Sequence, residues 1–220
     1  MDLLPKDADT NSVQISSVDL GFNSIELMGR YFPDVRVQGR NRNGVLRLAV
    51  TGRELNGVLS YRPGDPSSPG NHGRVSAQFK QLTIPAAPAS PVQASGEAGT
   101  SQNMKASEIP VLDLLVEDFR LSNRALGRLE ATAHGAPQGM VIDSLQLSHP
   151  DSVIQMSGLW RDAGTGETQG RLQVEIVDAG RMLSRFGFKD AIKRGVVVLH
   201  GDVGWAGTPL DFDFQTLAGT

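Results

Sequence analysis

Hydrophobic and polar residues alternate with a period of two along most of this chain. Val75, Ala77 and Phe79, for example, are separated by Ser76 and Gln78. Successive side chains of a β-strand point to opposite faces of the sheet. The pattern therefore predicts strands with one apolar face and one polar face, and the same alternation recurs up to the end of the chain.

Turn signals separate these segments at intervals of about 8–12 residues, which is the spacing of an antiparallel meander. The pairs Asn43-Gly44 and Asn56-Gly57 are two of them. Glycine (25) and proline (12) are plentiful and aromatic residues make up only 5% of the chain, which favours short strands joined by turns. We predict a mostly β protein, built as an extended antiparallel meander that curls into an open groove.

One segment, near residues 178–187, follows the helical spacing i, i+3, i+4, i+7 instead. Its apolar positions are Ala179, Met182, Leu183 and Phe186. Asp178 is the expected N-cap and Gly187 the expected C′ residue. A helix of about ten residues is not stable alone in water. We therefore expect Met182, Leu183 and Phe186 to dock on an end of the sheet.

The chain divides into two strand-rich segments, residues 1–85 and 109–220, which resemble each other and indicate a weak internal duplication. Between them, residues 86–108 are rich in Ala, Ser, Gly and Pro and offer little apolar surface, so a flexible linker is predicted there. We expect the second segment to continue the sheet of the first, because repeated meanders add along one axis.

The 220 residues carry a net charge of −3, and no basic platform with interleaved aromatic residues is present, which argues against nucleic-acid binding. Cysteine is absent, and no apolar run approaches the length needed to span a bilayer. The first residues lack the features of a signal peptide. Met1 followed by a polar stretch is typical of a chain cut from a longer protein, so we expect a fragment.

Catalytic and metal-binding patterns are missing from the sequence. The histidines His72, His134, His149 and His200 have no metal-ligand spacing and are expected at the surface. Asp211 and Asp213 share a strand face, but such pairs are common on wet faces of strands. No serine lies in a nucleophile elbow. We predict no enzyme, no cofactor and no metal site.

The second half resembles the AsmA-like superfamily and, within it, the YhdP-type proteins of Gram-negative bacteria. The features that carry the resemblance are "SLQLSHPDSVIQMSGLW", then "DAGRMLSRFGF", then "RGVVVLHGDVGWAGTPLDFDFQTLAGT". The first half is similar more loosely, through "GVLRLAVTGRELNGVLSYRP" and "GRVSAQFKQLTIP". The resemblance implies a periplasmic segment of a bridge-like lipid transporter, whose groove carries phospholipid acyl chains between the inner and outer membranes.

The same resemblance implies an N-terminal inner-membrane helix outside this segment and further polypeptide at both ends. The groove lining is expected from the alternating apolar residues: Leu46, Leu48, Leu112, Leu114, Val116, Leu145, Leu147, Ile154, Met156, Leu172, Val174, Ile176, Val197, Leu199, Leu210, Phe212 and Phe214. Trp160 and Trp205 end strands, and either pack in the core or line the groove.

Two other functions compete with the lipid groove. A closed β-sandwich, acting as an adhesion or assembly module of a larger envelope protein, would seal the same apolar faces against each other. A periplasmic hydrolase would need a polar cluster in a cleft, and the sequence shows none. Phospholipid that stays bound through purification would separate the groove from the sandwich.

Overall fold

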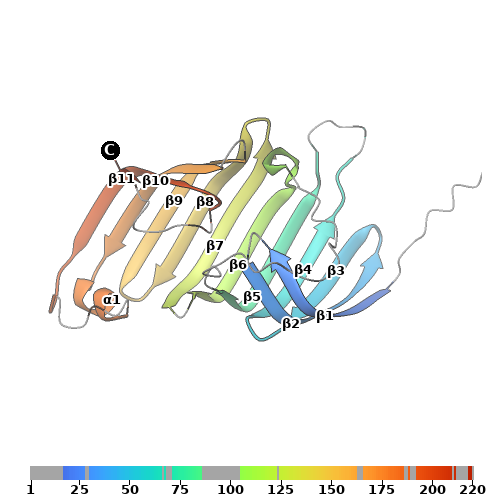
Figure 1. Cartoon of the computed structure of the whole chain (residues 1–220), viewed down its shortest axis with the longest axis horizontal. Coiled ribbons are helices and arrows are strands. Elements are labelled where there is room, and N and C mark those ends of the chain that lie inside the picture. Colours follow the sequence, from blue (N-terminus) through green and yellow to red (C-terminus); the bar gives the residue numbers. More distant parts are fainter. Residues whose placement is uncertain are drawn as a thin grey trace, which may run out of the picture.

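A computed structural model describes residues 17–27, 30–65, 67, 71–85, 105–122, 124–162, 166–185, 188, 192–209, 211 and 218–219. In this part of the chain, twelve strands form one sheet in sequence order, and the sheet does not close into a barrel (Figure 1). They are β1 (Ser17–Leu27), β2 (Arg30–Arg42), β3 (Val45–Thr51), β4 (Leu55–Arg62), β5 (Arg74–Ile84), β6 (Val111–Leu121), β7 (Arg124–Ala136), β8 (Gly139–His149), β9 (Ser152–Arg161), β10 (Glu167–Ile176), β11 (Val197–Ala206) and β12 (Ala218–Gly219). The predicted mostly β fold is confirmed.

One pairing departs from the predicted meander. β5 and β6 run parallel, with Arg74 opposite Val111 and Ile84 opposite Leu121, whereas the other neighbouring pairs are antiparallel. A parallel pair requires a crossover, because the chain must return to the starting end of the sheet. The segment between the two halves makes this return, so both halves belong to one sheet.

Of the predicted linker at 86–108, the structure describes only residues 105–108. Residues 86–104 lie outside the described residues, but Ala106–Glu108 form a short 3₁₀ helix, η1, against β7 and β8. Ala106 is completely buried, and its backbone N–H donates a hydrogen bond to Asp162 Oδ2 at 2.6 Å. A small apolar residue therefore anchors this end, which the polar composition of the segment concealed.

The two turn signals had different outcomes. Asn43 and Gly44 form the tight turn between β2 and β3, with φ angles of 52° and 75° that suit these two residue types. The expected turn at Asn56-Gly57 is wrong, because both residues belong to β4. A Cβ atom on Gly57 would lie 2.4 Å from Cδ1 of Phe79. The same Cβ would lie 2.4 Å from the carbonyl oxygen of Gln78, so glycine is needed there because β5 passes close by, not because the chain turns.

β1 was not among the predicted strands, although its residues Val18, Leu20 and Phe22 alternate with polar or small ones. Its first and last residues pair with β2, which places it at one edge of the sheet. Leu20 is 48% exposed and Phe22 38% exposed. The alternation was present in the sequence, but it starts inside a polar N-terminal stretch where no turn signal marks the strand.

The predicted helix is present as α1 (Ala179–Arg185), and Asp178 caps it by accepting a hydrogen bond from the backbone N–H of Arg181 at 3.0 Å. Its buried residues are Ala179 and Gly180, whereas Met182 and Leu183 are half-buried. The helix is therefore buried most deeply at its N-terminus and not at the predicted docking residues. A Cβ atom on Gly180 would lie 2.6 Å from the carbonyl oxygen of Ile192. Phe186 and Gly187 lie outside the described residues.

The sheet curls, as the buried residues show. Phe32 and Val35 of β2 belong to the same cluster of buried residues as Ile84 of β5, Val116 and Phe119 of β6 and Leu129 of β7. In a flat sheet β2 would lie about 14 Å from β5, three spacings of about 4.8 Å. Their side chains meet because β1 and β2 turn back toward β5 and β6 (Figure 1).

Two polar contacts hold this curl at the start of β2. The Arg30 guanidinium donates a hydrogen bond to the carbonyl oxygen of Pro85 at 3.3 Å and forms an ion pair with Asp211 at 3.2 Å. Asp211 also accepts hydrogen bonds from the backbone N–H and the hydroxyl of Thr208. The segment that follows β11 thus reaches back to the second strand, although nine strand spacings separate β2 from β11 in the sheet order.

Candidate functional site: the inner face of the sheet

One face of the sheet carries an unbroken row of apolar residues and one glycine, directly opposite one another on successive strands. Residues that pair directly across strands point to the same face. From β1 to β11 the row is Leu20, Val37, Val50, Gly57, Phe79, Val116, Leu129, Leu147, Ile154, Val174 and Leu199. We call this the long row, and the face that bears it the inner face.

A second row lies beside the long row on the inner face. From β1 to β11 it contains Val18, Gly39, Leu48, Leu59, Ala77, Leu114, Ala131, Leu145, Met156, Leu172 and Gly201. No ionisable side chain interrupts either row. Apolar side chains therefore form a band across the sheet, at right angles to the strands, in which directional polar contacts are absent.

The sequence prediction placed the lining residues on a common face. Leu46 and Leu112 lie in a third row on this face, and Ile176 and Val197 pair with each other two residues beyond the long row. The other predicted residues that the structure describes belong to the long row or to the second row. Leu210, Phe212 and Phe214 lie outside the described residues. Val37, Val50, Phe79 and Leu129 were not included in the prediction, although they show the same alternation.

Burial along the long row is deepest in the middle of the sheet and falls toward both edges. Val116 on β6 is completely buried, whereas Leu20 on β1 is 48% exposed and Leu199 on β11 is 47% exposed. On β8 to β10 the row is half-buried at Leu147, Ile154 and Val174. The inner face is consequently a sealed core around β6. It is half-buried on β8 to β10, where Leu147 still packs against the core cluster, and exposed on β11.

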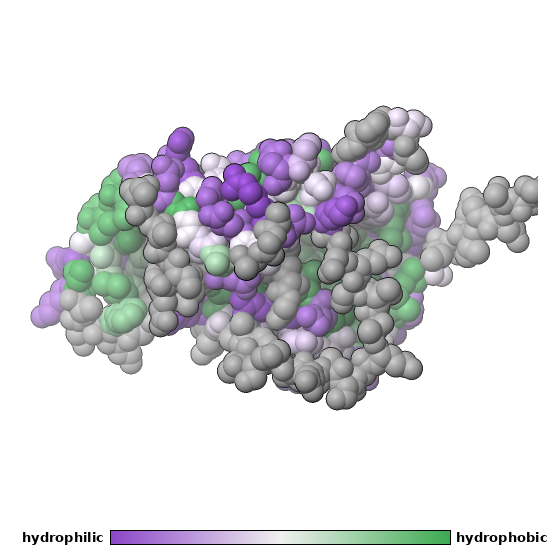
Figure 2. Space-filling model, turned by 45° about the horizontal axis from the view of Figure 1, so that its top comes forward, coloured by the Kyte–Doolittle hydropathy of each residue, from purple (hydrophilic) through white to green (hydrophobic). Residues whose placement is uncertain are grey.

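The β11 end of the sheet exposes several large apolar side chains close together in the sequence. β11 begins with three consecutive apolar residues, Val197, Val198 and Leu199, directly after Val196, and each of the four is exposed. Hydrophobic side chains gather on the left side of Figure 2, which is the β11 side in Figure 1. Strands that are apolar on both faces are typical of sheets covered on both faces.

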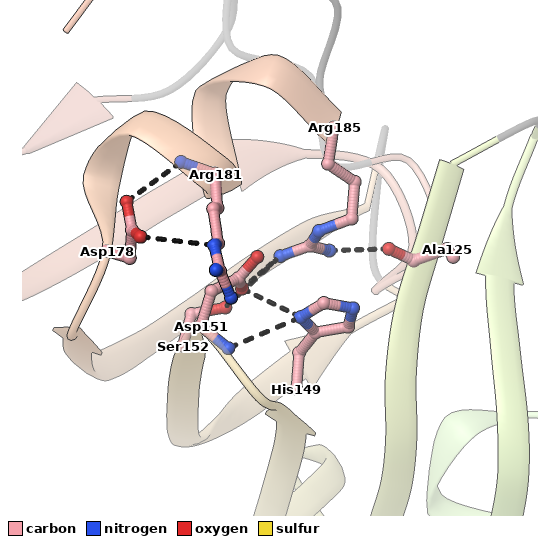
Figure 3. Close-up of polar contacts among 7 residues, drawn as sticks. All are labelled: Ala125, His149, Asp151, Ser152, Asp178, Arg181 and Arg185. Carbon is pink, nitrogen blue, oxygen red and sulfur yellow. Dashed lines mark hydrogen bonds and ion pairs between the residues drawn. The ribbon is translucent and has the colours of Figure 1, made fainter. Parts of the chain in front are cut away.

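A polar cluster fixes α1 against the strands at one end of the inner face (Figure 3). The Arg185 guanidinium donates hydrogen bonds to Asp151 Oδ1 at 2.6 Å, to the Ser152 hydroxyl at 3.3 Å and to the carbonyl oxygen of Ala125 at 2.5 Å. His149 Nδ1 lies 2.8 Å from the same Oδ1 atom. One side chain of α1 thereby links the end of β8, the start of β9 and β7.

The cluster keeps Asp151 ionised. Burial by itself raises the pKa of this carboxyl, but the hydrogen bond from Ser152, the hydrogen bond and charge of Arg185 and the hydrogen bond with His149 outweigh it. The resulting pKa of Asp151 lies below its ordinary value in the folded protein. A carboxyl with a lowered pKa stabilises the fold above its unfolded-state pKa, and that contribution disappears as pH falls through the folded-state pKa.

We expect Asp151→Asn to lower the free energy of unfolding by about 3 kcal/mol at neutral pH, because Arg185 keeps a buried charge without its carboxylate. The difference from the wild type should shrink as the pH falls below about 4, where the unfolded-state carboxyl takes up a proton, and should disappear once the pH falls through the lower folded-state pKa of Asp151. Chemical denaturation at a series of pH values measures it.

Asp118→Asn is the matched control, since Asp118 pairs with Arg120 at the surface and exposed pairs contribute little. An equal loss in the two variants, or a loss for Asp151→Asn that does not depend on pH, would contradict the role assigned to the cluster.

The remaining candidate polar residues do not converge. His134 lies on β7 and contacts Asp143, whereas His149 is the last residue of β8. His200 is exposed on β11. Within the described residues, no three His, Asp or Glu side chains lie close enough together to hold a metal ion. Asp211 contacts Thr208 and Arg30, and Asp213 lies outside the described residues.

The tryptophans lie at the other end of the inner face. Trp160 of β9 and Trp205 of β11 both pair with Thr168 of β10, so they point to the same side. Trp205 is buried and its indole N–H donates to the carbonyl oxygen of Thr208 at 2.9 Å. Trp205 therefore packs in the core, and Trp160, which is half-buried, packs against the buried cluster that includes Met140 and Ile142.

A curled sheet with an apolar inner face and short repeated meanders is the arrangement that the family resemblance implied. The family model described as "YhdP protein" matches residues 5–220. The chain belongs to the YhdP family. The match spans β1 to β12, so both halves of the sheet are part of it, including the first half, whose resemblance was looser.

A comparison with curated proteins and a comparison with solved structures each found no match to this YhdP-family chain. In the described residues, no helix has the length and hydrophobicity that a membrane span requires. What the YhdP-family fold does must therefore be argued from the inner face itself.

Proposed function

We propose that this chain is a periplasmic segment of a bridge-like lipid transporter, and that its inner face carries the acyl chains of phospholipids. The observation that carries the proposal is the long row, which is apolar on every strand from β1 to β11 except at Gly57, half-buried on β8 to β10 and exposed on β11. Membership of the YhdP family supports it, since this is an envelope protein family.

The chemistry of the inner face suits an acyl chain. Each CH₂ group moved from water to an apolar surface contributes about 0.8 kcal/mol, and this contribution needs no directional bond. A ligand held in this way can shift along the rows without breaking hydrogen bonds, because the rows present none. Continuous apolar surface thus favours movement of lipids over binding of one lipid at one position.

In the complete protein we propose that further polypeptide extends the sheet at both edges and that an N-terminal helix anchors it in the inner membrane. The exposed apolar start of β11 supports the first part, because such a segment is stable only when covered. In this arrangement phospholipid moves along the inner face between the two membranes.

The second candidate is a closed β-sandwich that serves adhesion or assembly. The packing of β2 against β5, β6 and β7 favours it locally, since that part of the inner face is sealed. A sandwich needs two sheets packed face to face, whereas the described strands form one sheet. The half-buried residues of β8 to β10 also have no facing sheet, so the groove accounts for more of the structure.

Site-specific photocrosslinking tests the proposal with a matched pair of neighbouring positions. A photoreactive benzophenone side chain in place of Leu147 on the inner face should crosslink to phospholipid, which mass spectrometry of the purified protein detects. The same side chain in place of Gln146 should not, because successive residues of a strand point to opposite faces. Equal crosslinking at the two positions, or none at Leu147 in a folded protein, would exclude a lipid path along the inner face.

A further inference from the structure

The face opposite the inner face carries a cluster of arginines on three neighbouring strands. Arg40 and Arg42 lie on β2, Arg47 on β3 and Arg62 on β4, and all four are exposed. Arg40 pairs directly with Arg47. Residues opposite each other in a sheet are about 5 Å apart and residues two apart along a strand are about 7 Å apart. We call these four residues the arginine patch.

None of the four arginines has an ion-pair partner among the described residues, and the nearby carboxylates are already engaged. Asp19 accepts hydrogen bonds from Arg36 at 3.0 and 3.2 Å and from Gln38 at 3.0 Å. Asp113 forms an ion pair with Arg74 at 2.5 Å. Like charges directly opposite each other destabilise a sheet. The patch therefore concentrates positive charge at a cost, in a chain whose net charge is −3.

The patch borders a hollow that is large enough for a phosphorylated ligand. Its volume is about 970 Å³, and Arg40, Arg42 and Arg47 line it together with three hydroxyl groups, those of Ser17, Ser60 and Ser76. The basic residues here are all arginine and none is lysine. The planar guanidinium presents paired N–H donors that match two oxygens of a phosphate group. The Ser60 and Ser76 hydroxyls are already engaged with the Ser76 carbonyl oxygen and with Asp113, and Asp19, which also lines the hollow, is paired with Arg36. The guanidinium groups are therefore the donors that this hollow offers a phosphoryl group.

We infer that the arginine patch binds the phosphate-bearing headgroups of anionic phospholipids at a membrane surface. The chain then contacts lipid on both faces of one sheet, acyl chains on the inner face and headgroups of a bilayer on the opposite face. The choice of a phospholipid as the source of the phosphate rests on the proposed function, whereas the preference for phosphate rests on the patch alone. The patch holds the segment of sheet formed by β2 to β4 against the bilayer.

Vesicle flotation with the intact chain tests this inference. We expect the protein to bind mixed phosphatidylglycerol–phosphatidylcholine vesicles and not pure phosphatidylcholine vesicles. The double variant Arg40→Gln/Arg47→Gln should lower the partition coefficient about thirtyfold, since each arginine near an anionic surface contributes about fivefold. The control Arg128→Gln/Arg171→Gln removes two exposed arginines from the same face on β7 and β10, and its binding should match the wild type.

Three results would overturn the inference: binding that does not depend on phosphatidylglycerol, a patch variant that binds as well as the wild type, or an equal loss in the control variant. Inorganic phosphate at matched ionic strength should not displace the protein, and displacement would show a site for free phosphate instead. Phospholipid retained by the same preparations is measured in parallel. Its absence from the wild type would count against the inner-face proposal, whereas vesicle binding decides the patch.

Discussion

Val174→Asp, introduced into the full-length protein, is expected to leave the fold intact and to reduce lipid transport to background. Val174 lies in the long row on β10, between Ile154 and Leu199, where the inner face is open and the side chain is half-buried. A carboxylate there can reach water, so the fold does not bear the cost of a buried unpaired charge. It does place a charge in the path of every acyl chain that passes β10.

The neighbouring variant Gln173→Asp is the matched control, because Gln173 is exposed on the opposite face of the same strand. It should retain transport and the same melting temperature. Val116→Asp provides the opposite contrast, since Val116 is completely buried and a charge there should unfold the protein. If Val174→Asp also unfolds, the inner face is sealed at β10 and the sandwich is correct. If it stays folded with full transport, Val174 does not line the path.

Phe32→Ala is expected to lower the free energy of unfolding by about 3–5 kcal/mol, the usual cost of removing a buried phenylalanine ring. Phe32 is 3% exposed and belongs to the cluster that joins β2 to β5, β6 and β7. The loss should be large because the ring packs between strands that are not neighbours in the sheet. Chemical denaturation of the wild type and the variant measures it.

Phe22→Ala is the corresponding control on the adjacent strand β1, where the ring is 38% exposed and a smaller loss is expected. Similar losses in the two variants would show that the curl does not depend on the contact made by Phe32. In that case the cluster would be a consequence of the sheet's shape and not one of its causes.

The effects expected for Val174→Asp on transport and for Phe32→Ala on stability come from different parts of the inner face. Around β6 the inner face stabilises the protein, and on β8 to β11 it is available to a ligand. The lipid transport proposed above needs both properties, because the sheet must be stable and must still leave apolar surface for a ligand. The polar cluster of Asp151 and Arg185 adds local stability at the end of this open region, without covering the rows.

Most of the individual elements follow from the sequence because their causes are local. Alternation of side chains is a property of an extended backbone, so Leu172, Val174 and Ile176 already indicate a strand with one apolar face. Asp178 caps α1 through a hydrogen bond within three residues. The family could also be inferred from sequence, since the order of these local features is itself characteristic.

Contacts between residues that are far apart in the sequence could not be predicted and became visible only in the tertiary structure. The parallel pairing of β5 with β6 depends on where the chain returns after residue 84, which no nearby residue specifies. Gly57 looked like a turn residue, and only the close approach of Gln78 and Phe79 on the neighbouring strand explains it. Arg40 and Arg47 meet because two strands align in one register, and Arg185 meets Asp151 across 34 residues of sequence.

By itself, the sequence determined that this chain forms amphipathic strands with a short capped helix and no evident catalytic chemistry. Only the tertiary structure decided that the strands form one curled sheet, that its inner face is sealed near β6 and open near β11, and that arginines gather on the opposite face. The reason is physical. The period of side chains is set residue by residue along the backbone, whereas curl, register and surface charge arise from contacts between strands that are far apart in the sequence.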